Sequence, residues 1–256
     1  MINVTKRDQC PLPHLSPNTA PGAEAAGAAP TACPVSHPHH THSVNTTNVS
    51  SSSSSSSEHA HSSAVLSSAE LVAAQSTLCY VREFLAKPNP HLGRAGPTCP
   101  FVPKSLQLDS IHLCVLSVAQ VARPEDLDPL LLEAIHTFKG LEPKSGPKAS
   151  FKAMILIFPD MELSAISEMI DGTQKRLKPN FVEEGLMLGE FHLHNNATGL
   201  HNDHFYPLRT PYPCLAIRHM VPSDVVFLNP AEFPAGVRLK MLTTFVNKFG
   251  DKASND

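Results

Sequence analysis

"IHLCVLSVAQVARPEDLDPLLLEAIHTFKG", from Ile111 to Gly140, is the stretch of sequence that decides the fold. Its first part, Ile111 to Val121, is nearly continuously apolar and rich in β-branched residues, which predicts a strand covered on both faces. Pro124 then stands at a helix start, and the apolar residues that follow recur at helical spacing until Gly140. The stretch therefore predicts a buried strand followed by an amphipathic helix.

The same order of strand and helix repeats further along the chain. "KAMILIFP", Lys152 to Pro159, predicts a second buried strand, and Leu163 to Leu177 predicts a second amphipathic helix. "GLMLGEFHL" from Gly185 and "PCLAIRHM" from Pro213 predict two more strands, joined so directly that an antiparallel or irregular edge is expected. Further helices are expected at Ala64–Ala86 and at 231–249. The pattern predicts a single α/β (α+β) domain, with a mixed sheet of four or more strands and flanking helices.

The N-terminal part of the chain differs in composition from the rest. Residues 1–63 are rich in Ser, Pro, Ala, Thr and His, include the serine run Ser50 to Ser57, and show no apolar periodicity. Such a segment cannot bury a core, so we expect a disordered tail at 1–63 and the folded domain at 64–256. "HPHHTH", His37 to His42, could bind Zn or Ni weakly, but we attribute it to low-complexity composition.

Charge and hydropathy restrict the class of partner. The formal net charge is −3, and the positive charges are scattered, so we expect no nucleic-acid partner. No apolar stretch approaches the ~20 residues that span a bilayer, and the N-terminus lacks the apolar core of a secretory signal. We therefore expect a cytoplasmic protein without a membrane partner, whose six cysteines are thiols and whose partner is a small molecule. The sequence does not indicate an oligomeric state.

A histidine-rich segment from Gly185 to Met220 is the candidate site, with five of the fifteen histidines of the chain. These are His192, His194, His201, His204 and His219. On a strand, His192 and His194 would point to one face and could share a metal. A Zn or non-haem iron centre would add His201, His204 or Asp203 as a third ligand.

Haem is the other cofactor that the segment could hold, because it needs only one strong axial ligand. His192 would be that ligand and the metal-binding residue, with Gly189 allowing the macrocycle to approach the strand. Arg209 and Arg218 would neutralise the propionates. His204 or His219 would then act in catalysis by donating a hydrogen bond to bound oxygen.

The sequence also resembles a known family. The order "CPF" from Cys99, "ILIFPD" from Ile155, "GLMLGEFH" and "RTPYPCLAIRHM" resembles a family of small microbial proteins, over roughly residues 96–228. That family is distantly similar to the YqcI/YcgG-like haem proteins, which N-hydroxylate a guanidino or amine group. Gly189, His192, Arg209 and Pro213 follow the order of the haem family's motif, although Leu193 stands where that motif has proline. The resemblance implies His192 as the proximal haem ligand.

The expected function follows from these readings. The first hypothesis is a haem-dependent oxygenase that uses O2 and a reductant on a small amino-acid-derived or amine-containing molecule, in secondary metabolism. One alternative is a non-haem Fe or Zn enzyme that uses the histidines of 192–219, and another is a non-catalytic haem-binding or metal-binding protein. Cys99 is expected to be structural, and Asp160 to be either a functional carboxylate after a strand or a helix cap.

Overall fold

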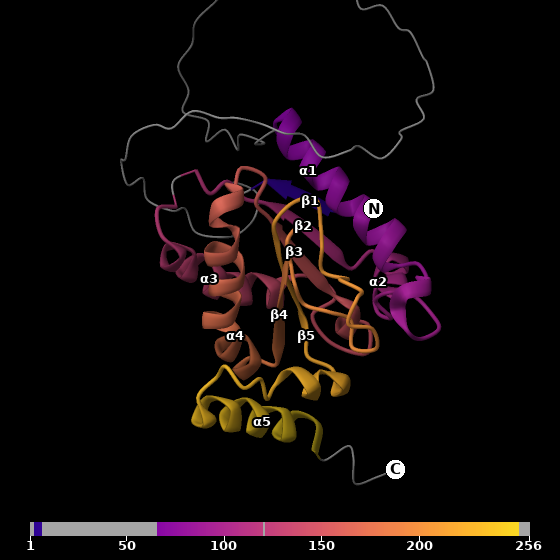
Figure 1. Cartoon of the computed structure of the whole chain (residues 1–256), viewed down its shortest axis with the longest axis vertical. Helices are drawn as coiled ribbons and strands as arrows, with labels where there is room; N and C mark the ends of the chain where they lie inside the picture. Colours follow the sequence, from indigo (N-terminus) through magenta and orange to yellow (C-terminus); the bar gives the residue numbers. More distant parts are fainter. Residues whose placement is uncertain (1–2, 7–65, 120, 251–256) are drawn as a thin grey trace, which may run out of the picture.

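A five-stranded sheet runs through the centre of the protein, with helices on both of its faces (Figure 1). The computed structural model describes residues 3–6, 66–119 and 121–250. The strands are β1 (Asn3–Lys6), β2 (Ile111–Val115), β3 (Ala153–Ile157), β4 (Leu186–Phe191) and β5 (Cys214–His219). Their order across the sheet is β1-β2-β3-β5-β4, so the last strand in the sequence lies between two earlier ones.

The sheet is mixed, as the sequence predicts. β1, β2 and β3 are parallel, while β5 runs antiparallel to both β3 and β4. The antiparallel pair expected between the last two strands is therefore confirmed. The first predicted strand was expected to reach Val121 but ends at Val115, because the backbone N–H of Val118 turns to the carboxylate of Asp160 at 3.0 Å.

Five α-helices surround the sheet in the described part of the chain. They are α1 (Ser68–Cys79), α2 (Val102–Gln107), α3 (Asp128–Gly140), α4 (Thr173–Glu183) and α5 (Ala235–Phe249). A π-helical turn, Tyr80–Leu85, continues α1, and another, Ser167–Gly172, leads into α4. The helix expected at Leu163–Leu177 continues to Glu183 because Phe181 and Val182 add buried side chains beyond Pro179.

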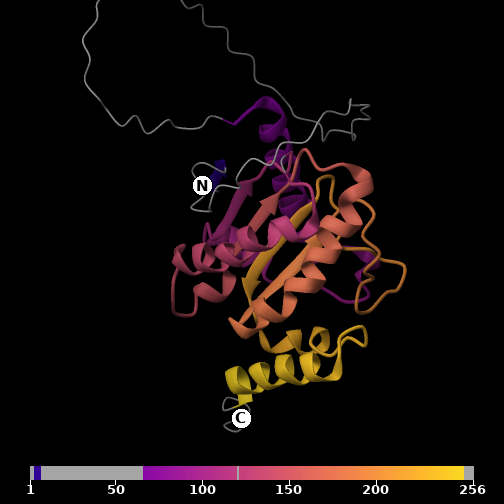
Figure 2. The same cartoon turned by 90° about the vertical axis from the view of Figure 1, so that its left-hand side faces the viewer.

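The core lies on both faces of the sheet. On one face, α3 and α4 bury Phe138 and Phe181 against strand residues such as Leu156, and Figure 2 looks onto this side. On the other face, α1 and its π-helical turn bury Ala73 and Val81. A third, smaller cluster joins α5 to the end of α4 at the lower end of Figure 1.

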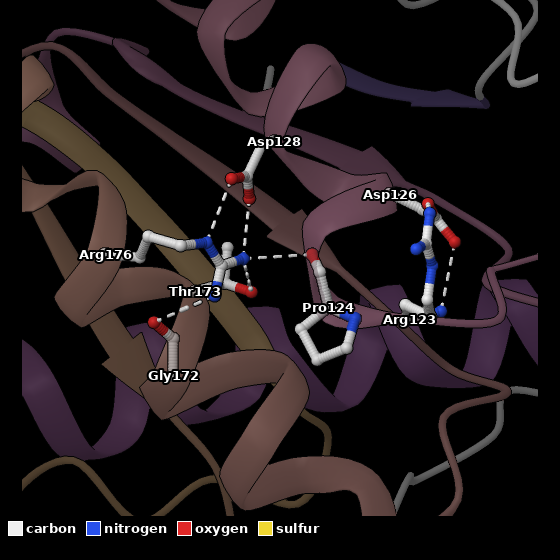
Figure 3. A network of polar contacts seen from close by, with 7 residues as sticks. All are labelled: Arg123, Pro124, Asp126, Asp128, Gly172, Thr173 and Arg176. Carbon is white, nitrogen blue, oxygen red and sulfur yellow. Dashed lines mark hydrogen bonds and ion pairs between the residues drawn. The ribbon is translucent and has the colours of Figure 1, made fainter.

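Arg176 fixes α4 to the start of α3 (Figure 3). Its guanidinium donates to both carboxylate oxygens of Asp128, at 2.9 and 2.6 Å, and to the carbonyl oxygen of Pro124 at 3.0 Å. Bidentate arginine–carboxylate pairs have restricted geometry. The position of α4 on the sheet, and of the side chains that it presents, is thereby fixed.

The N-terminal residues include one strand that the sequence did not predict. Within the range 1–63 that was expected to be disordered, Asn3–Lys6 forms β1 and pairs with β2. A strand there satisfies backbone groups that an open edge of β2 would leave unpaired. Residues 1–2 and 7–65, including His37–His42, lie outside the described residues. None of the helices in the described ranges is long and apolar enough to cross a membrane.

Candidate functional site: a polar cleft beside β4

A cleft of about 320 Å³ opens where the beginning of α4 faces the end of β4. Its walls come from four segments: the π-helical turn and α4 (Asp171, Gln174, Lys175, Lys178), β4 (Glu190), the following loop (His194 to Ala197), and the segment before α5 (Glu232, Phe233). The lining carries acidic, basic and amide groups, one imidazole and one phenyl ring. Such a site is suited to a small polar molecule.

The helix presents its polar residues to the strand, not only to water. Asp171, Gln174, Lys175 and Lys178 are spaced i, i+3, i+4 and i+7, so they share one face of the helix. The amide of Gln174 donates to the carbonyl oxygen of Leu188 at 3.0 Å, which brings that face against β4. This stripe was overlooked in the sequence, because the polar side of an amphipathic helix is ordinarily solvated.

The strand contributes the second wall. Leu186 and Leu188 point into the core beneath α3 and α4, and alternation puts Glu190 on the same side of β4. His192 follows one residue after the strand ends and is buried. A single glutamate in a strand that is otherwise apolar up to Phe191 is the sequence signal that could have located the cleft.

His192 forms a partly buried hydrogen bond with the cleft wall. Its Nε2 lies 2.8 Å from Oδ1 of Asp171, and its ring is almost fully buried, at 3% exposure for the residue. Because a carboxylate can only accept, Nε2 carries the hydrogen. Nδ1 is buried without a hydrogen-bond partner among the residues that the structure describes. The ring does not line the cleft itself, but it contacts Asp171, which does.

Two ionisable groups of the cleft have shifted pKa values. Burial raises the pKa of the Glu190 carboxyl, a backbone hydrogen bond and the charge of Lys178 oppose that effect, and the nearby charge of Asp171 adds a smaller increase. Burial lowers the pKa of the Lys178 ammonium, against the charges of Glu190, Glu232 and Asp224. Both groups are thus moved toward their neutral forms, as is typical of acid–base residues.

The loop after β4 is held in place from within. Asn195, itself buried, donates to the carbonyl oxygen of Glu190 at 3.3 Å and accepts from the N–H of Ala197 at 2.8 Å. Arg209 donates to the carbonyl oxygen of Asn195 at 2.9 Å and stacks on Tyr206, with its guanidinium 3.9 Å from the ring centroid. Arg209 therefore holds the loop in place, whereas the sequence predicted that it would neutralise a haem propionate.

Arg218 and His219 lie at the other end of the strand pair. Arg218 pairs in register with Met187, five residues before His192, which places it roughly 16 Å away along the strand. Its guanidinium forms a bidentate pair with buried Asp224, with both distances at 2.7 Å. His219 packs on the ring of Phe138 at 5.1 Å, and burial lowers its pKa to about 4. The structure does not bring either residue to His192.

The remaining predicted ligands do not assemble either. His194 lines the cleft but is exposed, because the chain leaves the strand at Phe191 and the expected shared face with His192 is lost. His201, Asp203 and His204 are exposed in the loop that follows. Across residues 66–119 and 121–250, no three His, Cys, Asp or Glu side chains gather closely enough to hold a metal ion.

A haem on His192 does not fit this arrangement. The ring is buried, Nε2 is bonded to Asp171, and Nδ1 is covered by protein, so no face of the imidazole is open to a macrocycle. A side chain added at Gly189 would meet the ring of Phe191 at 3.3 Å. The absence of a side chain there accommodates Phe191, and it does not open a space for a cofactor.

Two further residues singled out in the sequence lie away from the cleft. Cys99 packs against the cluster beneath α1 and donates its backbone N–H to Leu85 at 2.8 Å, in keeping with a structural role. Asp160 accepts hydrogen bonds from the Ser117 hydroxyl at 2.5 Å and the Val118 N–H at 3.0 Å. It joins the connections that follow β2 and β3, where a helix cap or a functional carboxylate was expected.

Comparison with known proteins places the chain in a family. A family model described as a domain of unknown function, DUF6875, matches residues 74–256, which include every residue of the cleft. The chain belongs to this family. No curated protein and no solved structure gives a significant match. The distant resemblance to YqcI/YcgG-like haem proteins stays a prediction.

Proposed function

We propose that the cleft beside β4 binds a small amine-bearing molecule and exchanges protons with it. The observation that carries this proposal is the meeting, in one cleft, of Glu190 with a raised pKa and Lys178 with a lowered pKa. Groups whose environments move their pKa values toward neutrality can act as acid and base near pH 7. The protein would then be an enzyme with an acid–base step.

The charges of the cleft support an amine as the ligand. Three carboxyl side chains line it, from Asp171, Glu190 and Glu232, against the two lysines Lys175 and Lys178. An ammonium group can satisfy the carboxylates, and an acidic group on the same molecule can satisfy the lysines. In the proposed step, Glu190 and Lys178 act on the bound ligand as an acid–base pair, in which one side chain donates a proton to the ligand and the other accepts a proton from it.

Binding can be measured by NMR on the labelled protein. Free amino acids with side-chain amines should shift the backbone amide signals of Asn195 to Ala197, and the same amino acids with acetylated amines should not. Glu190→Gln should weaken the effect about tenfold or more, which corresponds to the loss of about 1.4 kcal/mol of binding free energy. Glu168→Gln is the matched control, because Glu168 is exposed in the π-helical turn and does not line the cleft. Equal binding of acetylated and free amines would contradict the proposal.

A haem-dependent oxygenase is the second candidate. The observation in its favour is the pairing of His192 with the carboxylate of Asp171, the partner that ligating histidines commonly have. It requires the buried ring to become accessible, together with O2 and a reductant as partners. A visible spectrum of protein produced with added iron and haem precursor tests it. A Soret band that is lost in His192→Ala would support haem binding, and a spectrum without the band would overturn it.

Location and partner class also belong to the proposal. We propose a cytoplasmic protein that acts on a small molecule of secondary metabolism and does not bind nucleic acid, as the sequence predicts. Cell fractionation and a binding assay with mixed-sequence DNA and RNA test these points. Recovery in the membrane fraction, or nucleic-acid binding at physiological salt, would contradict them.

A further inference from the structure

The charged side chains of the cleft are ordered along its helical wall. We propose that the cleft selects an ω-amino acid, in which the amine and the carboxylate lie at opposite ends of the carbon chain, with the ammonium group bound at Asp171 and the carboxylate bound at Lys178. This inference rests on the proposed function, because it assumes that the cleft binds an amine. It adds where each charged group of the ligand binds and how far apart the two groups are.

Asp171 is the first residue of the polar stripe that lines the cleft, and a buried donor holds it in place. Its Oδ1 lies 2.8 Å from Nε2 of His192. The side chain of His192 is 4% exposed, whereas that of Asp171 is 40% exposed. A carboxylate has two acceptor oxygens, so the hydrogen bond to His192 leaves acceptor capacity on the cleft surface. An ammonium group of a ligand can donate to this carboxylate.

Lys178 is the last cleft residue of the same stripe, and it contacts an aromatic ring. Its Nζ lies 5.9 Å from the centre of the Phe233 ring. Phe233 packs on the cluster that contains Val182 and Met187, near the end of α4 and the start of β4. This contact draws the ammonium of Lys178 away from Asp171. A ligand carboxylate at Lys178 favours the charged form of its ammonium, which opposes the effect of burial on its pKa.

The opposite charges of the cleft do not pair with one another. Besides Asp171, the charged lining residues are Lys175, Lys178, Glu190 and Glu232. None of these four forms an ion pair with another residue that the structure describes. Outside the cleft, by contrast, Lys139 is paired with Glu184 and Lys240 with Glu183. A ligand with one charge of each sign complements such a lining.

The helix sets the distance between the two binding groups. Asp171 and Lys178 are seven residues apart, which corresponds to a rise of about 10 Å between their Cα atoms. In an α-amino acid a single carbon atom separates the amine from the carboxylate, so the molecule is too short to contact both residues. A longer ω-amino acid such as ε-aminocaproate can contact both.

A homologous series of amino acids tests the inference. Glycine, β-alanine, γ-aminobutyrate and ε-aminocaproate carry the same two charged groups at increasing separation. Their dissociation constants are measured from the backbone amide signals of the labelled protein. We expect ε-aminocaproate to bind about tenfold more tightly than glycine, and about tenfold more tightly than its own amide, which lacks the negative charge.

Two substitutions locate the ends of the bound ligand. Lys178→Met keeps the length of the side chain but removes its charge, so this variant should bind ε-aminocaproate and its amide equally. Asp171→Asn should weaken the binding of both compounds to the same extent, because both carry the ammonium group. Lys240→Met is the matched control, since Lys240 is paired with Glu183 and does not line the cleft, and it should change neither affinity.

The outcomes distinguish this inference from the proposed function. If amines bind but glycine binds as tightly as ε-aminocaproate, or the amide as tightly as the acid, the cleft recognises the amine alone. The inference is then overturned and the proposed function stands. A folded Lys178→Met variant that still prefers ε-aminocaproate to its amide also overturns the inference. If no amine binds, both the inference and the proposed function fail. The melting temperature and the amide spectrum of each variant check its folding.

Discussion

The two ends of the β4–β5 strand pair both contain charged groups that are at least partly buried, but their surroundings differ. At one end, Lys152 is 1% exposed, donates to the carbonyl oxygen of Leu141 at 2.7 Å, and lies 4.7 Å over the ring of Phe138. At the same end, the guanidinium of Arg218 forms an ion pair with the carboxylate of Asp224. At the other end, Glu190 and Lys178 face a cleft and have shifted pKa values.

The difference separates structural charges from functional ones. Lys152 and Asp224 at the Phe138 end are buried and paired with other groups of the protein, so they contribute to stability. Burial shifts pKa values at both ends, since it lowers those of Lys152 and His219 and raises that of Glu190, but the charges at the cleft end also face open space. Buried charge is therefore evidence for a functional site only where it adjoins a cavity.

The largest loss of stability is expected from a substitution at the Phe138 end. Phe138 is fully buried and contacts both the ammonium of Lys152 and the ring of His219. Phe138→Ala removes these contacts and leaves a cavity, so the free energy of unfolding should fall by about 3–5 kcal/mol. Denaturant melts measure this change. A loss below about 1 kcal/mol would mean that this end is not tightly packed.

Asp224→Asn should cost less. The substitution removes the charge that pairs with Arg218, whose side chain is a third exposed and can reach water. We expect the free energy of unfolding to fall by about 2 kcal/mol, the range of a hydrogen bond to a charged group. Asp126→Asn is the control, because its exposed pair with Arg123 should contribute little to stability. Equal losses in both variants would argue against a structural role for Asp224.

The groups at the two ends should also change the free energy of unfolding with pH in opposite directions. His219 has a pKa lowered to about 4, mainly by burial, so the unfolded chain binds more protons between about pH 4 and 6.5. Its contribution to stability is present above pH 6.5 and is lost as the pH falls toward 4. Glu190, with a raised pKa, gives the opposite slope, because stability falls as the pH rises through its folded pKa.

The variant His219→Phe tests the pH dependence of stability that is expected from His219. Phenylalanine can pack on Phe138 but does not titrate. The wild type should lose on the order of 1 kcal/mol more than His219→Phe between pH 6.5 and 4, a figure reduced for the partial exposure of the ring. Chemical melts at the two pH values measure it. Parallel curves for the two proteins would show that His219 does not titrate in this range.

The sequence predicts the elements better than it predicts the site. Apolar runs and helical spacing located four strands and the main helices, because burial imposes those periods. The location of the site, in contrast, depends on how β4 and β5 pair with each other. β5 is antiparallel to β4, so His192 lies near the start of β5, and Arg218 lies at the far end of the pair. Nearness along the chain within the histidine-rich segment was therefore misleading.

Two other features could not be predicted from local patterns. β1 has only four residues, and they pair with a strand more than a hundred positions away, so no local periodicity marks it. The polar stripe from Asp171 to Lys178 has the pattern of a solvated helix face. Only the packing of α4 on β4 shows that the stripe faces Glu190.

Glu190→Gln tests the central claim most directly, because it replaces the cleft carboxyl with a neutral group of the same shape. The account predicts that the free energy of unfolding at pH 7 stays within about 0.5 kcal/mol of the wild type or rises, since partial burial opposes ionisation of Glu190. Binding of free amines should at the same time weaken by about tenfold or more, about 1.4 kcal/mol. A fall in unfolding free energy of more than about 1 kcal/mol, with amine binding unchanged, would make Glu190 a structural residue and contradict the account.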